Sequence, residues 1–301
     1  MKLLITGASG FIGQHLVKKL IEQGHTILAL SRSADLQHGS NNTDKLIYFK
    51  SSLELENRAL QRIKDFEPDV LIHLAWGKIP DFSFETSFEN LQNHIHFFRN
   101  IFTVNSLKKI IVTGSCWEYN KKVGVCAESD ICVSGNYFTW AKNSLRDFLQ
   151  FECLQKNINF IWPRVFYVYG SQQRIGSLIP SVIESIRNGL MPELKTPFNA
   201  NDFIYVDDVA EGLLQFAIND ISSGIYNLGS GKSMPVIDVV SSIENSLNGN
   251  LILSKKLLIR TKQSKKDTDF CADMTKTFST INWKPITNLV MGIEKMINYK
   301  K

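Results

Sequence analysis

Three glycines near the start of the chain, Gly7, Gly10 and Gly13, constrain the fold more than any other sequence feature. They follow the apolar run at residues 3–6 and lead into residues 11–23, where apolar side chains recur with helical spacing. Between a strand and a helix, the first glycine permits a tight turn, the second lets the backbone approach a pyrophosphate, and the third allows close packing. The helix start then directs its N–H groups at the phosphates. The motif predicts a dinucleotide-binding turn, with contacts from Gly7, Ser9, Gly10, Phe11, Ile12 and Gly13.

Short, continuously apolar runs alternate with amphipathic stretches as far as residue 165. Continuously apolar strands are typical of a parallel sheet that is covered on both faces. Regular strand–helix alternation with right-handed crossovers predicts an α/β fold with a Rossmann-type doubly wound parallel sheet. The expected strands are residues 3–6, 26–30, 46–49, 70–74, 110–113 and 160–165, and the expected helices are residues 11–23, 56–66, 87–105 and 137–155.

The alternation becomes less regular after Gly170. Helical patterns at residues 179–188, 206–218 and 236–248 are separated by short extended stretches at residues 202–205 and 225–228. We therefore expect residues 1–170 to form the dinucleotide-binding domain. Residues 171–301 are expected to form a smaller C-terminal substrate-binding lobe, with some chain exchange back to the sheet.

Charge and cysteine content exclude several classes of protein. The chain has 34 basic and 29 acidic side chains, and this net charge of +5 is too small to indicate nucleic-acid binding. Five cysteines without metal-ligand spacing fit a reducing compartment rather than a disulfide framework. His94 and His96 are two apart on an expected helix, so they face different sides and predict no metal site. With no signal-peptide pattern and no apolar run of the ~20 residues needed to span a bilayer, a cytoplasmic protein without a membrane partner is expected.

The glycine spacing, Gly-x-x-Gly-x-x-Gly, resembles the signature of the extended short-chain dehydrogenase/reductases, the NAD(P)-dependent epimerase/dehydratase family. The resemblance extends over nearly the whole chain and includes five further motifs. They are His73-Leu74-Ala75-Trp76 at the end of the fourth strand, Asn90 25 residues before Ser115, the stretch at residues 202–210, and the later segments 226–231 and 282–285.

This resemblance implies a nicotinamide cofactor, with Leu74, Ala75, Trp76 and Asn90 among its contacts. It also implies a nucleotide-sugar substrate. A homodimer is implied as well, formed through a four-helix bundle of residues 87–105 and 137–155.

The end of the second strand bears on which cofactor binds. It reads Ser31-Arg32 and lacks the carboxylate with which NAD enzymes usually bind the ribose 2′-hydroxyl. A hydroxyl and a guanidinium suit a 2′-phosphate, which favours NADP(H), with NAD possible. The alternative is that Arg32 is solvated, or stacks on adenine in an NAD enzyme.

The segment at residues 113–119 resembles the family segment that carries the catalytic hydroxyl, and Ser115, four residues before Tyr119, matches that position. Sugar dehydratases have Asp-Glu directly after this residue, whereas this chain has Cys116 and Trp117. Elimination needs a paired acid and base there, so dehydration is disfavoured. Cys116 and Trp117 are interpreted as substrate contacts, and Glu118 as a solvated side chain or a helix-cap partner.

The next helix contains Trp-Ala-Lys-Asn, and Lys142 matches the catalytic lysine of the family, which also contacts the cofactor. The family has tyrosine four residues earlier, where this chain has Phe138. Residues i and i+4 share a helix face, so that tyrosine and the lysine act together. Three interpretations stay open: a distorted first turn delivers Tyr137; another donor such as water, Tyr119 or Tyr167 acts beside Phe138; or proton transfer is impaired, by a natural or an introduced change.

Two further positions are candidate substrate contacts. Tyr167 replaces the asparagine of the family's sugar-nucleotide segment, and Arg260 corresponds in place to a pyrophosphate-binding arginine. These features together favour an NADPH-dependent nucleotide-sugar ketoreductase that acts on C4 of a deoxysugar for surface polysaccharides. The alternatives are an NAD-dependent C4 epimerase and a non-catalytic homologue without the active-site tyrosine.

Overall fold

The computed structural model describes residues 1–32, 44–120, 123–261 and 265–299. The chain divides into two compact units, each made of three segments. The first unit contains Met1–Asn120, Ile131–Arg164 and Ala210–Tyr226, and the second contains Lys121–Asp130, Val165–Val209 and Asn227–Lys301. The domain boundary expected at residue 170 stays a prediction.

A large sheet forms the framework of the first unit, and it has the strand order β3-β2-β1-β4-β5-β8-β11, with β6 beside β8. The pairs β1–β2, β2–β3, β1–β4, β4–β5 and β5–β8 are all parallel. The strand order reverses at β1, as in doubly wound folds that bind ligands at the carboxyl ends of their strands. The expected α/β fold class is confirmed. The strands are β1 (Lys2–Thr6), β2 (Thr26–Ser31), β3 (Leu46–Lys50), β4 (Val70–His73), β5 (Lys109–Val112), β6 (Gly114–Ser115), β8 (Asn159–Val165) and β11 (Gly224–Leu228).

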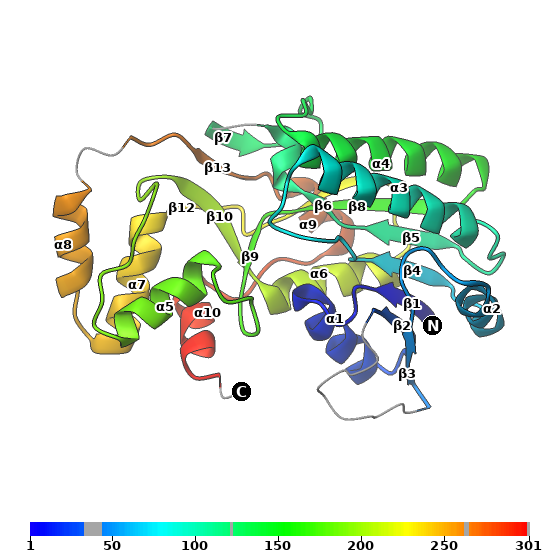
Figure 1. Cartoon of the computed structure of the whole chain (residues 1–301), viewed down its shortest axis with the longest axis horizontal. Helices are drawn as coiled ribbons and strands as arrows, with labels where there is room; N and C mark the ends of the chain where they lie inside the picture. Colours follow the sequence, from blue (N-terminus) through cyan, green and yellow to red (C-terminus); the bar gives the residue numbers. More distant parts are fainter. Residues whose placement is uncertain (33–43, 121–122, 262–264, 300–301) are drawn as a thin grey trace. The chain divides into compact units, whose positions relative to one another are not determined.

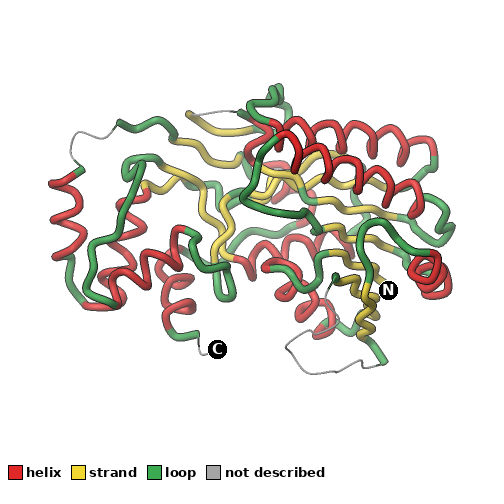
Figure 2. The backbone as a smooth tube through the Cα atoms, in the orientation of Figure 1, coloured by secondary structure: helices red, strands yellow, loops and turns green. Residues whose placement is uncertain are grey.

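Helices cover both faces of this sheet because its strands are buried on both sides. Figure 1 shows α3 and α4 side by side along one face and α1 and α6 along the other. Figure 2 shows the same helices, in red, flanking the yellow strands. A core of aliphatic and aromatic side chains packs α2, α3 and α4 onto their face, and a Lys19–Glu211 ion pair of 3.0 Å joins α1 to α6. The helices are α1 (Phe11–Glu22), α2 (Asn57–Phe66), α3 (Phe84–Ile101), the short 3-10 helix η1 (Cys116–Tyr119), α4 (Tyr137–Gln155) and α6 (Val206–Ile218).

The expected helix at residues 87–105 is wrong at both ends, since α3 runs from Phe84 to Ile101. Ser83 is the N-cap, and its side chain accepts a hydrogen bond from the Thr86 N–H at 3.4 Å. A serine at this position satisfies one of the free N–H groups of the first turn. The capping signal therefore lies four residues before the start that the apolar pattern predicts, whereas the other expected helices of this unit agree to within one residue.

The second unit contains a smaller sheet with the order β12-β10-β13-β7, with β9 beside β10. The buried Asp202 carboxylate accepts N–H groups from Ser230, Gly231 and Ala272 at 2.6, 2.9 and 3.0 Å, and so fixes the turn at residues 229–231 against β13. The strands are β7 (Val123–Cys126), β9 (Tyr167–Tyr169), β10 (Ala200–Tyr205), β12 (Ser233–Pro235) and β13 (Asp269–Ala272), and the helices are α5 (Leu178–Arg187), α7 (Val236–Asn248), α8 (Ile252–Arg260), α9 (Thr275–Ile281) and α10 (Leu289–Ile297). Within the described residues, none of the helices is both long and apolar enough to cross a membrane.

Candidate active site

The glycine turn between β1 and α1 leaves no room for side chains. Gly7 has φ +70°, and a Cβ on it would lie 2.8 Å from the Ala75 nitrogen, at the end of β4. A Cβ on Gly13 would lie 2.1 Å from the Gly7 oxygen. The N-cap of α1 is Gly10, which has no side chain to cap the helix, and its first turn carries no acidic residue. The first N–H groups of α1 therefore remain available to an anion, as a bound pyrophosphate requires.

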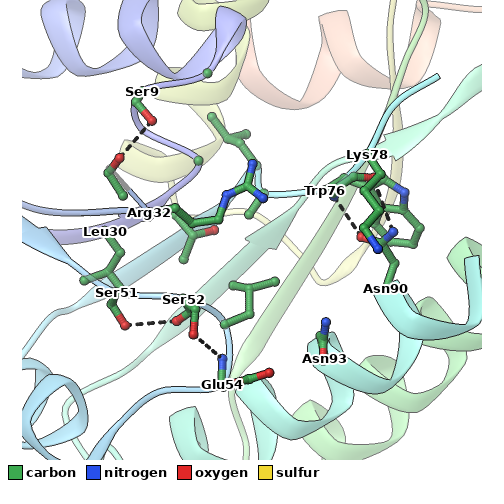
Figure 3. A pocket seen from close by; sticks show the side chains of 18 of the residues that line it. Ser9, Leu30, Arg32, Ser51, Ser52, Glu54, Trp76, Lys78, Asn90 and Asn93 are labelled. Carbon is green, nitrogen blue, oxygen red and sulfur yellow. Dashed lines mark hydrogen bonds between the residues drawn. The ribbon is translucent and has the colours of Figure 1, made fainter. Parts of the chain in front are cut away.

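A cavity of about 400 Å³ opens beside this turn, at the carboxyl ends of β1, β2, β3 and β4 (Figure 3). A cavity of this size and position suits part of a dinucleotide. Most of the predicted cofactor contacts line it, whereas Phe11, Ile12, Gly13 and Lys142 do not. The predicted contacts that line it are Gly7, Ser9, Gly10, Ser31, Arg32, Leu74, Ala75, Trp76 and Asn90. The remaining lining residues are Thr6, Leu30, Ser51, Ser52, Leu53, Glu54, Gly77, Lys78, Glu89 and Asn93.

Hydroxyl groups and one guanidinium meet at the β2 end of the cavity. The Ser31 hydroxyl is buried and lies 3.0 Å from the Ser9 hydroxyl. Figure 3 shows the Arg32 side chain extending into the cavity, and among the described residues its guanidinium has no hydrogen-bond or ion-pair partner. One exposed carboxylate, that of Glu54, also lines this cavity. Glu54 follows β3, whereas the carboxylate that usually binds the ribose of NAD lies at the end of β2. A phosphate between Ser9, Ser31 and Arg32 would pair with this guanidinium, which has no partner in the described part of the chain.

Helix α3 fixes the loop that follows β4. The Asn90 side chain accepts the Gly77 N–H at 2.8 Å and donates to the Gly77 and Thr86 carbonyls at 3.3 and 2.8 Å. The His94 ring nitrogens lie 2.5 Å from the Asn90 oxygen and 2.9 Å from the Ala75 oxygen. Burial lowers the pKa of His94 to about 4, so the neutral ring has one N–H and bonds one of these carbonyls at a time. Asn90 and His94 thus hold in place the segment after β4 that lines the cavity.

Strand β5 leads through Thr113 into the turn that carries Ser115. The Ser115 hydroxyl oxygen accepts the N–H of Trp117 at 3.2 Å, which leaves its O–H free to donate to a ligand. Cys116 is buried and Trp117 is half-buried beside it. The position that matches the catalytic hydroxyl of the family motif thus follows the carboxyl end of β5.

The predicted solvation of Glu118 is wrong, because its side chain is fully buried. One carboxylate oxygen accepts the Ser115 N–H at 2.7 Å, and both oxygens accept the Trp162 indole N–H at 3.1 and 3.0 Å. Arg164 Nε donates at 3.0 Å, and Arg146 lies 3.5 Å away. The other interpretation, a helix-cap partner, is confirmed, since the contact to Ser115 closes the capping box of η1.

Helix α4 begins regularly at Tyr137. The Asn136 side chain caps it by accepting the Thr139 N–H at 2.9 Å, so the first turn is not distorted. Tyr137 is 53% exposed, and its ring lies 5.3 Å from that of Phe84 on the outer side of α3. Phe138 and Lys142, one turn apart, are both buried. The interpretation in which an irregular helix start delivers Tyr137 therefore has no structural support.

Aromatic rings surround Phe138. Its ring centroid lies 5.5 Å from Trp76, 5.2 Å from Phe82 and 6.1 Å from Trp117. Lys142 Nζ lies 4.0 Å from the Trp76 ring centroid and donates to the Thr113 carbonyl at 2.9 Å. Lys142 and Phe138 thus both contact Trp76, which also lines the cavity, and Trp117 of the Ser115 turn packs on Phe138.

The other candidate donors and contacts are Tyr119 in the first unit and Tyr167 and Arg260 in the second. Tyr119 is 4% exposed, bonds Arg164 and lies under its guanidinium at 4.4 Å. Tyr167 belongs to the second unit, with its ring 5.9 Å from Phe203 and 6.1 Å from Phe270. Arg260, also in the second unit, is exposed at the end of α8. Their predicted substrate contacts stay predictions.

Three functional neighbours escaped sequence reasoning: Phe82, Trp162 and Arg164. Trp162 and Arg164 are two residues apart on β8, so both face the same side of the sheet. An arginine inside a buried strand needs a buried carboxylate, and this signal points to Glu118. Phe82 lies in a loop, where no periodicity indicates which way a side chain faces.

The parallel sheet, the glycine turn and the cavity beside it define a dinucleotide-binding α/β protein. The model of the NAD dependent epimerase/dehydratase family matches residues 3–229, and the chain belongs to this family. The family comprises NAD(P)-dependent nucleotide-sugar enzymes, among them reductases, epimerases and dehydratases.

Curated relatives and solved structures extend over nearly the whole chain. The chain is 24% identical to dTDP-4-dehydro-6-deoxyglucose reductase of Escherichia coli, over 98% of this chain and 96% of that protein. It is 25% identical to CDP-abequose synthase of Salmonella muenchen, over 100% and 98%. The fold resembles UDP-glucose 4-epimerase of Thermotoga maritima with UDP-glucose, with a TM-score of 0.82, 21% identity and coverage of 99% and 98%. It also resembles UDP-glucuronic acid 4-epimerase of Bacillus cereus with NAD, with a TM-score of 0.78, 20% identity and coverage of 99% and 98%.

Proposed function

We propose that this protein reduces a keto group, at C4, on a nucleotide-activated 6-deoxysugar with NADPH, for surface-polysaccharide biosynthesis. The observation that carries the proposal is the arrangement at the end of β5. The free O–H of Ser115 and the ammonium of Lys142, which bonds Thr113, are both donors at one turn. Two donors suit a carbonyl oxygen that gains charge during reduction. Cys116 and Trp117, in place of an Asp-Glu pair, leave elimination without its acid and base.

The residues of the first cavity fit an NADP cofactor. The glycine turn and the open start of α1 would hold the pyrophosphate, and Ser9, Ser31 and Arg32 would hold the 2′-phosphate. Leu74, Ala75, Trp76 and Asn90 would line the rest of its path. When bound, the reduced nicotinamide supplies a hydride to the substrate.

Cys116 and Trp117 of the first unit would contact the nucleotide-sugar. Tyr167 and Arg260 belong to the second unit and stay predicted substrate contacts that rest on the sequence resemblance. Support for this substrate class comes from the relatives, which include a reductase of a dTDP-linked 4-dehydro-6-deoxysugar and a CDP-sugar enzyme. Trp117, Phe82 and Phe138 form an apolar wall that suits a sugar carbon without a hydroxyl.

A homodimer through α3 and α4 is part of the proposal. Phe84, Phe88, Phe151 and Leu154 on these two helices are 45, 40, 61 and 75% exposed. An apolar helix face of this kind is typical of an interface between subunits. Sedimentation equilibrium of the purified protein tests this: a dimer is expected, and a monomer for a Phe151→Glu variant.

Cofactor content and turnover test the activity. The protein is purified, its bound nucleotide is released and identified, and NADPH and NADH are supplied with dTDP-4-dehydro-6-deoxyglucose and CDP-linked 4-keto-sugars. We expect an exchangeable NADPH site and net reduction of at least one keto-sugar. Binding of NADPH without turnover of any of these substrates would favour a non-catalytic homologue, a candidate supported by the phenylalanine at position 138.

A C4 epimerase is the second candidate, because both solved structures named above are 4-epimerases. An epimerase keeps a tightly bound NAD and oxidises and reduces the same carbon. Retained NAD and interconversion of C4 epimers without added cofactor would support this candidate over the reductase.

A further inference from the structure

Lys142 carries a buried charge without a carboxylate partner. The residue is 6% exposed, and no ion pair joins it to any described residue. Its Nζ has one hydrogen-bond acceptor, the Thr113 carbonyl at 2.9 Å, although an ammonium has three N–H groups. At least one N–H is therefore available to a ligand. Because unsatisfied donors make a buried ammonium costly, a ligand oxygen that accepts this N–H would be bound favourably.

Two tyrosines of the first unit, Tyr137 and Tyr119, were candidate proton donors from the sequence. Neither is placed to donate a proton beside Lys142. Phe138 has no O–H and lies one turn before Lys142 on α4. The Tyr137 side chain is 53% exposed and packs on Phe84, away from Trp76. Tyr119 is buried and engaged by Arg164, whose guanidinium lies 4.4 Å from its ring centroid.

Glu118 is a fully buried carboxylate whose charge acts on Lys142. The Trp162 indole lies between them: its N–H bonds both Glu118 oxygens, and Lys142 Nζ lies 5.9 Å from its ring centroid. Burial lowers the pKa of Lys142 to about 8, and the Glu118 charge opposes this by raising it. The other titratable groups that face Lys142 are His73 and His94, whose pKa values burial lowers, so both are neutral.

We propose that the Lys142 ammonium is the proton donor of the reduction, and that Glu118 is the positioning residue that keeps this ammonium charged and holds the Ser115 turn beside it. This inference rests on the proposed function. As a hydride from the reduced nicotinamide adds to the carbonyl carbon, the C=O π bond breaks and its electron pair takes a proton from Nζ. One N–H bond breaks and one O–H bond forms, the ketone is reduced to an alcohol, and the nicotinamide is oxidised. The neutral amine then regains a proton from water.

The proposal fixes the direction of the pH dependence. The donor form is the ammonium, which is present below its pKa, so the rate of reduction falls as pH rises through about 8. Removing the Glu118 charge takes away the contribution that raises this pKa. The decline in a Glu118→Gln variant therefore moves to lower pH.

A titration by nuclear magnetic resonance tests the charge arrangement without any substrate. The protein is labelled with lysine carrying carbon-13 at Cε, and the Cε shifts are followed with pH. We expect one lysine to titrate near pH 8, to vanish from the spectra of Lys142→Arg, and to titrate at lower pH in Glu118→Gln. Glu244→Gln is the matched control, because Glu244 is also fully buried and hydrogen-bonded but lies in the second unit. In this variant we expect Lys142 to titrate as it does in the parent.

Turnover of the keto-sugar nucleotide with NADPH tests the donor role. In Lys142→Arg the cation remains but stays protonated at all accessible pH. We expect kcat to fall by ~10²–10⁴-fold, the contribution of a placed general acid, and the alkaline decline to disappear. Because this variant keeps the charge, it decides the question even where Glu118→Gln does not fold.

Several results overturn the proposal. The first is a parent protein in which no lysine titrates below pH ~9, clearly under the ordinary value near 10.4. The second is a Glu118→Gln variant that folds and titrates as the parent does. The third is a Lys142→Arg variant that keeps the parent's alkaline decline. A parent that binds NADPH and reduces none of the substrates overturns the proposed function and the donor role with it, whereas the coupling of Glu118 to Lys142 is judged by the titration alone.

Discussion

Phe138 is the residue at which this chain departs from the family motif that it resembles, because a phenyl ring stands where that motif has the phenol of a tyrosine. The ring packs against Trp76, Phe82 and Trp117 and lies one helical turn from Lys142. A hydroxyl added at its tip would lie beside a cation, which lowers a phenol's pKa. The substitution back to tyrosine is therefore informative about the donor.

If Tyr137 were the proton donor, Tyr137→Phe would abolish activity and Phe138→Tyr would change it little. We expect the opposite result for each variant. Phe138→Tyr raises kcat by less than the ~10²–10⁴-fold that a general acid contributes, because Lys142 already donates a proton in the parent. Tyr137→Phe leaves kcat unchanged, because Tyr137 faces outward. Both are measured as NADPH oxidation with the keto-sugar nucleotide. Loss of activity in Tyr137→Phe would contradict this account.

In the proposed function, Arg32 is the residue that would favour NADPH over NADH. Arg32→Asp should weaken NADPH binding by ~10- to 150-fold, since a charge-assisted hydrogen bond contributes ~1.5–3 kcal/mol, and should leave NADH binding similar or stronger. Dissociation constants from quenching of protein fluorescence measure both. Lys78→Asp is a charge-matched control, because Lys78 lines the same cavity but pairs with Glu89. Equal NADPH affinity in Arg32→Asp and the parent would remove the argument for NADP.

At the scale of elements, the Glu118 cluster joins η1 to β8 and α4. Trp162 and Arg164 reach Glu118 from β8, and Arg146 reaches it from α4. Three elements that carry the chemistry thus meet at one carboxylate. Removing one partner of a buried ion pair leaves an uncompensated charge, which costs more than the pair contributes.

Glu118→Ala should therefore lower the free energy of unfolding by ~3–5 kcal/mol. Urea unfolding followed by circular dichroism measures this. Replacing both partners, as in Glu118→Leu with Arg164→Met, should recover part of the loss because no charge is left unpaired. The exposed Glu22→Ala is the control and should stay within ~0.5 kcal/mol of the parent. A loss below ~1 kcal/mol in Glu118→Ala would mean that the cluster is solvated after all.

The β1–α1 turn gives an independent test of the cofactor site. A Cβ on Gly10 would already lie 3.1 Å from the Gly7 oxygen, and a valine there would also fill the approach to the helix start. Gly10→Val should abolish NADPH binding while the circular dichroism spectrum is retained. A folded variant with normal affinity would show that the dinucleotide does not contact this turn.

Elements with strong local signals were predictable from the sequence, and those set by tertiary contacts were not. The glycine turn, the parallel strands and α4 follow from spacing and apolar pattern, and α4 has the predicted bounds. The start of α3 depends on a cap at Ser83, outside the apolar pattern. The burial of Glu118 depends on Trp162 and Arg164, which are far away in sequence and meet it only through the pairing of β8 with β5 and β6. The positions of Tyr167 and Arg260 in the second unit had no periodicity to fix their roles.

At the scale of the whole molecule, the two candidate functions differ in how hydride is transferred. A reductase transfers it from the cofactor to the sugar, whereas an epimerase removes it from a carbon and returns it to the same carbon. The family includes reductases and epimerases on the same fold, so the fold does not decide between them. A cofactor that binds only the folded state raises the midpoint of thermal unfolding of the protein. Because we propose that NADPH binds more tightly than NADH, this midpoint should rise more with NADPH at equal concentration. A larger rise with NADH would favour the epimerase.

Transfer of deuterium tests the central claim most directly. The purified protein is incubated with NADPH deuterated at nicotinamide C4 and with dTDP-4-dehydro-6-deoxyglucose, and the product is examined by mass spectrometry and nuclear magnetic resonance. A reductase places deuterium on sugar C4 and yields an equal amount of NADP⁺, and this is the result we predict. C4 epimers that interconvert on protein-bound NAD, with no deuterium in the sugar, would contradict it.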